Sequence, residues 1–335
     1  MKKILFLILP VIIISALSFY SCNDNINGVT PNEGIPMQFV SSYNTSGYCF
    51  NSFTRNLGGN DYAFLSLDTS GIEILNINNP SSPQFIAGYN IAGNVEEISV
   101  SYINNATYMF VATGTGGLKV LNISNISTPI LDTTLTYSGD YINSVFVDEY
   151  HKKLYTGSTN AKVYVYDITN LPNVTSLSTY SSFSSINEIQ VFNNIAYVAE
   201  DGGLDIVNVS NPNSPSRISQ GSSNDYAYDV KIMGNLAVIA NNANGVLLLD
   251  VSNPSNPTEL GFLDTYDIGL ACSINGNLVY VAEDAGGVEV YDISNPSNPV
   301  FIAFYQTNSF SQNVSYYNGN VYVSNYNDFV VLRYP

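Results

Sequence analysis

The chain repeats one phrase, written GVEVYDISNP at residues 287–296. Its other copies are GIEILNI at 71–77, GLKVLNI at 117–123, KVYVYDI at 162–168, GLDIVNV at 203–209 and GVLLLDV at 245–251, with a degraded copy, FVVLRY, at 329–334. The Asn or Asp of each copy, or Arg333 in the last, follows its predecessor by 46, 45, 41, 42, 42 and 41 residues. A period near 42 is typical of a four-stranded propeller blade. Seven copies predict an all-β chain folded as a seven-bladed β-propeller.

Residues 226–262 illustrate one repeat. Strands are expected at 228–233, 236–240, 245–251 and 258–262, with a tight turn at Gly234-Asn235, where Gly and Asn tolerate the positive φ of a short hairpin. The third strand is apolar throughout, which indicates a strand covered on both faces. The chain contains 26 Tyr and no Trp, and Tyr favours strands. No helix and no Gly-rich phosphate loop are expected, which argues against nucleotide chemistry.

The two ends of the repeat region are expected to meet. The sequence stops at Pro335, directly after a third strand, so the last blade lacks its fourth strand. Residues 38–43 (QFVSSY) resemble fourth strands such as 300–305 (VFIAFY). We therefore predict that the first strand of the domain completes the last blade and closes the ring, which leaves no open blade.

The repeat resembles a known family. The pattern Gly-Val/Leu-x-Val/Leu-x-Asp-Val/Ile-Ser-Asn-Pro, preceded by AYVA at 196–199, is similar to the LVIVD-repeat family of bacterial and archaeal surface propellers. The resemblance covers residues 37–335 and implies a location at the cell surface, while the family implies no general activity. Departures are Lys162 in place of Gly, the single prolines Pro129 and Pro172, and Arg333.

The N-terminus is typical of an export signal. Lys2 and Lys3 precede an apolar stretch at 4–17 that is shorter than a membrane span, and Cys22 follows it. This layout resembles a bacterial lipobox, in which residues 1–21 are removed and Cys22 is lipidated; ordinary cleavage nearby is the alternative. Residues 22–36 are expected to form a flexible tether and 37–335 the propeller. The protein is thus predicted to be anchored to the cell envelope, at the outer membrane or cell surface.

Charge and cysteines narrow the classes of partner. Ten basic residues stand against 27 acidic ones, and without Lys2 and Lys3 only eight basic residues remain, a net charge of about −19. Such a chain repels nucleic acid and anionic lipid surfaces.

The two remaining cysteines are not expected to form a disulfide. Cys49 is expected at the start of the first inner strand and Cys272 in the sixth, too far apart to bond. Both are interpreted as buried apolar residues.

Two sets of polar residues are interpreted as turn formers. The Asn or Asp of the repeat ends a strand before Ser or Asn, where a short acceptor binds turn N–H groups: Asn76, Asn122, Asp167, Asn208, Asp250 and Asp292. His151 is the only histidine and sits in a polar hairpin tip. A single histidine makes neither a His-based metal site nor a catalytic triad with a matching nucleophile.

One face of the ring collects the candidate site residues. We call it the loop face, because it carries the connections from each fourth strand to the next first strand and from second to third strands. Aligning the first strands by their turns places seven residues near the mouth of the central channel: Asn51, Glu97, Ser144, Glu188, Asp229, Ala271 and Asn313. Loops of the fourth and sixth blades add four acids: Glu200, Asp201, Glu283 and Asp284.

Aromatic residues lie three positions before four of these mouth residues: Tyr48, Tyr141, Tyr226 and Phe310. Acids beside aromatics suit sugar rings, whose hydroxyls bond carboxylates. They also suit a hard cation such as Ca²⁺, which would relieve the crowded charge, as would proton sharing. The alternative is that the aromatics close the channel and the acids only keep the face soluble.

We expect a non-catalytic, surface-exposed scaffold that binds a protein or a glycan through this acidic, Tyr-bearing face. A rival hypothesis is a carbohydrate-active lyase or hydrolase that uses Glu188 and Asp229 as paired carboxylates. A third is a purely structural component of the envelope.

Overall fold

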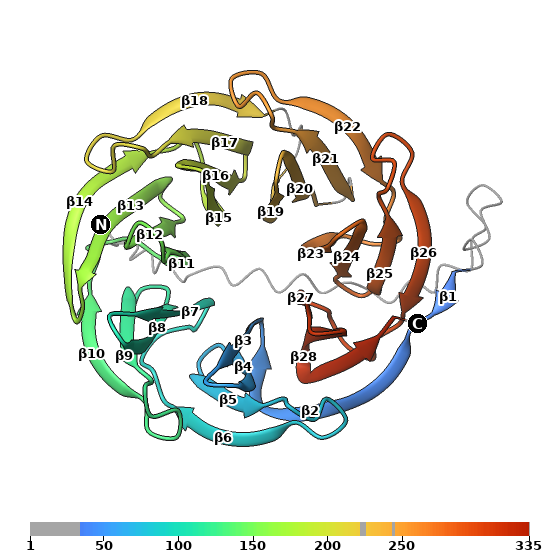
Figure 1. Cartoon of the computed structure of the whole chain (residues 1–335), viewed down its shortest axis with the longest axis horizontal. Helices are drawn as coiled ribbons and strands as arrows, with labels where there is room; N and C mark the ends of the chain where they lie inside the picture. Colours follow the sequence, from blue (N-terminus) through green and yellow to red (C-terminus); the bar gives the residue numbers. More distant parts are fainter. Residues whose placement is uncertain (1–33, 222–225, 243–244, 335) are drawn as a thin grey trace, which may run out of the picture. The chain divides into compact units, whose positions relative to one another are not determined.

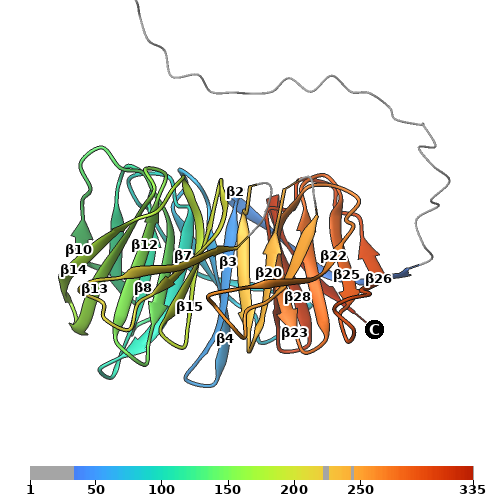
Figure 2. The same ribbon diagram turned by 90° about the horizontal axis from the view of Figure 1, so that it is seen from above.

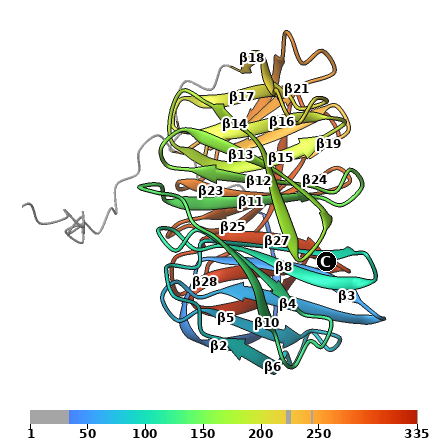
Figure 3. The same cartoon turned by 90° about the vertical axis from the view of Figure 1, so that its left-hand side faces the viewer.

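The computed structural model describes residues 34–221, 226–242 and 245–334, and in these ranges every regular element is a β-strand. Seven sheets surround a central axis (Figure 1). Figures 2 and 3 show the ring from its edge, with loops gathered on its two faces. The predicted seven-bladed β-propeller is confirmed. Within the same ranges no helix is long and apolar enough to cross a membrane.

Six blades are formed by consecutive antiparallel strands that run from the axis to the rim. Blade one contains β3 (Asn51–Leu57), β4 (Asn60–Ser66), β5 (Ile72–Asn76) and β6 (Gln84–Tyr89). Blade two contains β7 (Glu97–Ile103), β8 (Ala106–Ala112), β9 (Leu118–Asn122) and β10 (Ile130–Leu135). Blade three contains β11 (Ile142–Asp148), β12 (Lys153–Ser158), β13 (Lys162–Asn170) and β14 (Asn173–Ser181).

The next three blades follow the same order. Blade four contains β15 (Ile186–Phe192), β16 (Ile195–Glu200), β17 (Gly203–Asn208) and β18 (Ser216–Gly221). Blade five contains β19 (Asp229–Met233), β20 (Leu236–Ala240), β21 (Val246–Asp250) and β22 (Thr258–Leu263). Blade six contains β23 (Gly269–Asn275), β24 (Leu278–Glu283), β25 (Gly287–Asp292) and β26 (Val300–Tyr305).

Blade seven joins the two ends of the ring. β27 (Asn313–Tyr317) pairs with residues 320–324 of β28 (Asn320–Arg333), whose second half, 328–333, pairs with β2 (Gln38–Cys49). The two halves of β28 act as the second and third strands of the blade, and β2 is the fourth. The expected closure by residues 38–43 is confirmed. Cys49 ends β2, so it lies on the outer strand of blade seven, not at the start of the first inner strand as predicted.

The chain contacts the ring before the closing strand begins. β1 (Ile35–Pro36) pairs in parallel with β26, so a fifth strand lies on the rim of blade six. The amide of Met37 donates to the Phe304 carbonyl at 2.9 Å, and the Met37 side chain is buried between blades six and seven. The last residues assigned from sequence to the tether are thus part of the sheet. The segment 1–33, with Cys22, lies outside the described residues.

The repeated Gly has a steric cause. Gly245 and Gly287 both have positive φ, and a Cβ there would lie 2.2 Å from the carbonyl oxygens of Leu263 and Tyr305 on the fourth strand. In blade three, where Lys162 replaces Gly, the positive φ falls on Ala161. The hairpin turns also need residues that tolerate positive φ. Asn193 and Asn194 both have positive φ, as a tight hairpin requires.

The repeated Asn and Asp are turn formers, as predicted. Each side-chain oxygen accepts a hydrogen bond from the backbone N–H two residues later, at 2.7–3.0 Å.

The hydrophobic core lies between neighbouring blades, in clusters that each join two of them. Cys49 and Cys272 are both free and buried, as predicted.

Candidate functional site

The innermost strands of the seven blades surround a cavity of about 620 Å³ on the axis of the ring. That volume falls in the range of small-molecule sites. Residues from all seven inner strands line it. Ten of them are Ser, Asn or Gln, which are neutral and polar: Asn51, Ser52, Ser99, Ser101, Asn143, Asn187, Gln190, Ser273, Asn313 and Ser315.

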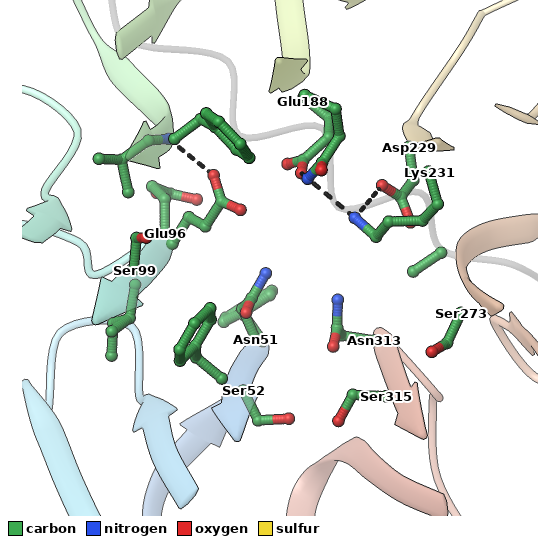
Figure 4. Close-up of a pocket in the computed structure, with 18 of the residues that line it drawn as sticks. Asn51, Ser52, Glu96, Ser99, Glu188, Asp229, Lys231, Ser273, Asn313 and Ser315 are labelled. Atoms are coloured by element: carbon green, nitrogen blue, oxygen red, sulfur yellow. Dashed lines mark hydrogen bonds and ion pairs between the residues drawn. The ribbon is translucent and has the colours of Figure 1, made fainter. Parts of the chain in front are cut away.

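The alignment of the first strands by their turns predicted most of the mouth residues that line the cavity. Six of the seven predicted mouth residues line it: Asn51, Glu97, Glu188, Asp229, Ala271 and Asn313. The seventh, Ser144, is fully buried in blade three. Figure 4 shows the amides of Asn51 and Asn313 directed into the cavity, across from Glu188 and Asp229. Among the described residues neither amide has a hydrogen-bond partner, so both are available to a bound molecule.

A lysine holds the acids of the cavity together. Lys231 Nζ contacts Asp229 Oδ1 at 2.6 Å and Glu188 Oε1 at 3.2 Å (Figure 4). Gln190 Nε2 donates to the same Glu188 oxygen at 3.0 Å, and Asp229 Oδ2 accepts the Cys272 amide of the next blade at 2.8 Å. Lys231 therefore occupies the position between the carboxylates that a metal cation would take.

Glu97 lies near this cluster, and its Oε2 accepts the Val145 amide at 2.7 Å. Burial and then the Glu188 charge raise the pKa of Glu97 well above its usual range. Burial alone would lower the pKa of Lys231, but the charges of Asp229 and Glu188 outweigh it and raise that pKa well above its usual value. The ammonium of Lys231 therefore offsets the negative charge of the acids that it contacts.

A second ion pair lines the cavity at the other end of the inner strands. Arg55 Nη1 lies 2.6 Å from Glu149 Oε1 and also donates to the Val100 carbonyl at 2.6 Å. Glu149 accepts the Tyr102 amide at 3.1 Å. Both cationic side chains of the cavity are therefore neutralised by acids of the protein, and no unpaired cation lines the cavity as described.

Four predicted acids are not brought into the cavity. Glu200 and Glu283 are fully buried within blades four and six, at the ends of β16 and β24. Burial and the neighbouring Glu289 carboxylate raise the pKa of Glu283 to about 10. Asp201 accepts a hydrogen bond from the cavity residue Asn187 at 3.0 Å but does not itself line the cavity. Asp284, like Asp201, is half-buried in the following loop. The alignment placed these loops on the correct face of the ring, but the side chains of the four acids do not point into the cavity as predicted.

The four predicted aromatics lie on the loop face around the cavity. Tyr48, Tyr226 and Phe310 are each about half exposed. The hydroxyl of Tyr141 donates to the Glu96 carboxylate, and Glu96 lines the cavity. Two further exposed aromatics, Phe183 and Tyr266, occupy the equivalent loops of blades four and six. They were missed because they lie five, not three, residues before the mouth position.

The expected cation has no counterpart among the described residues, where no group of three or more His, Cys, Asp or Glu could hold a metal ion. His151 is an exposed hairpin residue that contacts Asp148, as expected of a turn residue. Several cavity residues were missed, among them Lys231, Arg55 and Glu149. For Lys231 the available indication was its position two residues after Asp229 in the same strand, because residues i and i+2 of a strand share a face.

Comparisons with known proteins agree with this fold. The family model described as LVIVD repeat matches residues 59–91, 92–136, 185–220, 225–265 and 269–307, more than half of the chain. No curated protein matches the sequence. The crystal structure of Chaetomium thermophilum Raptor is similar, with a TM-score of 0.71 and 11% identity, over 90% of this chain and 30% of that one. At that identity the similarity shows the fold alone, and this chain spans less than a third of the length of its structural relative.

Proposed function

This chain belongs to the LVIVD-repeat family, and from that premise we propose that it is a non-catalytic binding module whose central cavity takes a neutral glycan. The observation that carries the proposal is the lining of the cavity. Amide and hydroxyl groups from several blades converge there, and the amides of Asn51 and Asn313 face it without a partner among the described residues. Sugar hydroxyls both donate and accept hydrogen bonds, and such groups match them.

Charge favours a neutral ligand over an anionic one. The chain has a formal net charge of −17, and Lys231 and Arg55 are already paired with acids of the cavity. An anionic sugar would meet Glu97 and Glu188 without a free cation to offset its charge. A neutral glycan avoids that repulsion, and we expect its affinity to change less than twofold between 0.05 and 0.5 M NaCl, because salt screens only charge interactions.

A glycan array with the mature propeller tests the proposal. We expect binding to neutral glycans, and Asn313→Ala should weaken it about two- to tenfold, since one lost hydrogen bond costs roughly 0.5–1.5 kcal/mol. Asn213→Ala is the matched control, because this exposed amide lies outside the cavity. An array without any bound neutral glycan would overturn the proposal and favour the purely structural role.

Cleavage of the glycan is the second candidate function. The oxygens of Glu188 and Asp229 that contact Lys231 lie at most about 6 Å apart, a limit that includes the roughly 5–5.5 Å spacing of retaining glycoside hydrolases but not the wider spacing of inverting ones. Both are bound to Lys231, however, and the acid with the strongly raised pKa is Glu97. We expect glycans that bind to be recovered uncut after prolonged incubation. Shortened products that disappear with Glu97→Gln would show an enzyme instead.

We further propose that the protein is exported and held at the cell envelope by a lipid on Cys22, a residue outside the described ranges. The support is the basic and apolar N-terminal sequence followed by Cys22. We expect Cys22→Ala to move more than about 90% of the protein from the membrane fraction to the soluble fraction, because a single covalent anchor would be lost. Unchanged membrane retention on immunoblots would contradict the anchor.

A further inference from the structure

A second cavity lies where the ring closes, between blades seven and one. This seam cleft has a volume of about 340 Å³. It is lined by Thr45, Ser46, Gly47 and Tyr48 of β2, by Asp68, Thr69 and Ser70 of the loop after β4, and by Asn327 of β28. No other blade junction has an equivalent of β2, because only this blade takes its fourth strand from the other end of the chain.

An aromatic cluster connects the seam cleft with the central cavity. Tyr326 stacks on Tyr48 with ring centroids 4.2 Å apart, and it meets Phe50 and Phe310 edge-on at 5.7 and 6.0 Å. Tyr48 lines the seam cleft and Phe50 lines the central cavity. A continuous strip of aromatic surface therefore runs from one cavity to the other.

The backbone at Tyr326 is held in an unfavourable conformation. Its φ is +47°, in the left-handed region that bulky residues rarely adopt and that costs of order 1–3 kcal/mol. This conformation accompanies the contacts of Tyr326 with the other three rings. Tyr326 lies in the turn between the two halves of β28, where a tight hairpin itself requires positive φ. The turn thus places the Tyr326 ring in the aromatic cluster.

The polar wall of the seam cleft offers hydrogen bonds but no cation. Asp68 is held at a turn by the amides of Val95 and Gly71, which donate to its carbonyl at 3.0 and 3.5 Å. Among the described residues its carboxylate has no hydrogen-bond or ion-pair partner. Of the residues that the structure describes, no Lys or Arg lines the cleft. A free carboxylate beside hydroxyls and an exposed Tyr ring matches the hydroxyls and the C–H face of a neutral sugar.

We propose that the seam cleft is a second sugar subsite, so that the ligand is an oligosaccharide that extends from the central cavity across the aromatic strip to Tyr48 and Asp68. This inference rests on the proposed function, because it adds a subsite to the same ligand. It also gives the closing strand β2 a role in binding, since β2 supplies one wall of the subsite.

Calorimetric titration with the neutral glycans of the array, from mono- to hexasaccharides of glucose, mannose, galactose, xylose and N-acetylglucosamine, tests the subsite. We expect affinity to rise at least tenfold from the shortest ligand that binds to the hexasaccharide. Tyr48→Ala and Asp68→Asn should each remove most of that rise while leaving the affinity for the shortest ligand within twofold. Asp68→Asn is nearly isosteric, so it tests the subsite even if Tyr48→Ala lowers the melting temperature.

Tyr150→Ala is the matched control, because this highly exposed Tyr lies in a β11–β12 hairpin on the face opposite the loops and lines neither cavity. It should leave the whole length series unchanged. An affinity that is independent of length, or a length series unaffected by both variants, would overturn the second subsite while leaving the proposed function intact. If no neutral glycan of any length binds, both proposals are wrong.

Discussion

Deletion of residues 37–44 is expected to lower the melting temperature by more than about 10 °C or to prevent folding. These residues form most of the pairing between β2 and β28. Val40 and Tyr43 pack against the buried Phe329 and Val331, and Met37 is buried between blades six and seven. Losing several such side chains at 2–5 kcal/mol each approaches the 5–15 kcal/mol by which a typical domain is stable.

The matched control is deletion of residues 34–36, which removes β1 and leaves β2 in place. β1 contributes only two paired residues on the rim, and both Ile35 and Pro36 are exposed. We expect this shorter deletion to lower the melting temperature by no more than about 4 °C, or roughly 1–2 kcal/mol. The melting temperatures of both deletion proteins are measured by thermal unfolding, and their aggregation is measured by light scattering. If the two deletions have equal effects, the closing strand does not carry the stability of the ring.

Lys231→Met is expected to destabilise the propeller by about 3–5 kcal/mol at pH 8, because it leaves Glu188 and Asp229 buried without their cation. Lys162→Met is the control. Its ammonium is partly exposed and lies 3.6 Å from Asp140, which also accepts hydrogen bonds from Tyr164 and Asn160. We expect the Lys162→Met variant to be destabilised by less than about 1 kcal/mol. The triple variant Lys231→Met, Glu188→Gln, Asp229→Asn should recover most of the loss, because the two acids that Lys231 contacts then carry no charge.

The stability of the Lys231→Met variant should fall as the pH rises. The charge of Lys231 holds down the pKa of Glu188, which burial already raises above its usual 4.5. Without Lys231 the folded-state pKa rises further above that of the unfolded chain. The folded state then binds more protons, so stability falls as pH rises above about 4.5. We expect the loss from Lys231→Met to be clearly smaller at pH 5 than at pH 8 in urea denaturation. A loss that grows toward pH 5 would contradict this account.

The architecture could be predicted from the sequence because its determinants are local and repeated. Gly at the start of most third strands, Asn or Asp at the end of most of them, and Asn-Asn or Asn-Gly turns each impose a backbone conformation within a few residues. Seven copies of that pattern specify blades, and the match of 38–43 with fourth strands specifies the closure. The alignment of inner strands also identified the cavity residues Asn51, Glu188, Asp229 and Asn313, because position along a strand determines which end of the channel a side chain reaches.

Only the tertiary structure decided which charges meet. Lys231 and Glu188 lie on different blades, and their contact depends on the distance between strands, which no local pattern reports. Glu200 and Glu283 were placed correctly in their loops, but packing inside the blades turned them away from the channel. The seam cleft likewise combines residues 45–48, 68–70 and 327, which are brought together when the N-terminal strand closes the ring. Backbone conformation is set by neighbours in sequence, whereas a binding site is made by side chains that meet across blades, and therefore only the folded ring defines it.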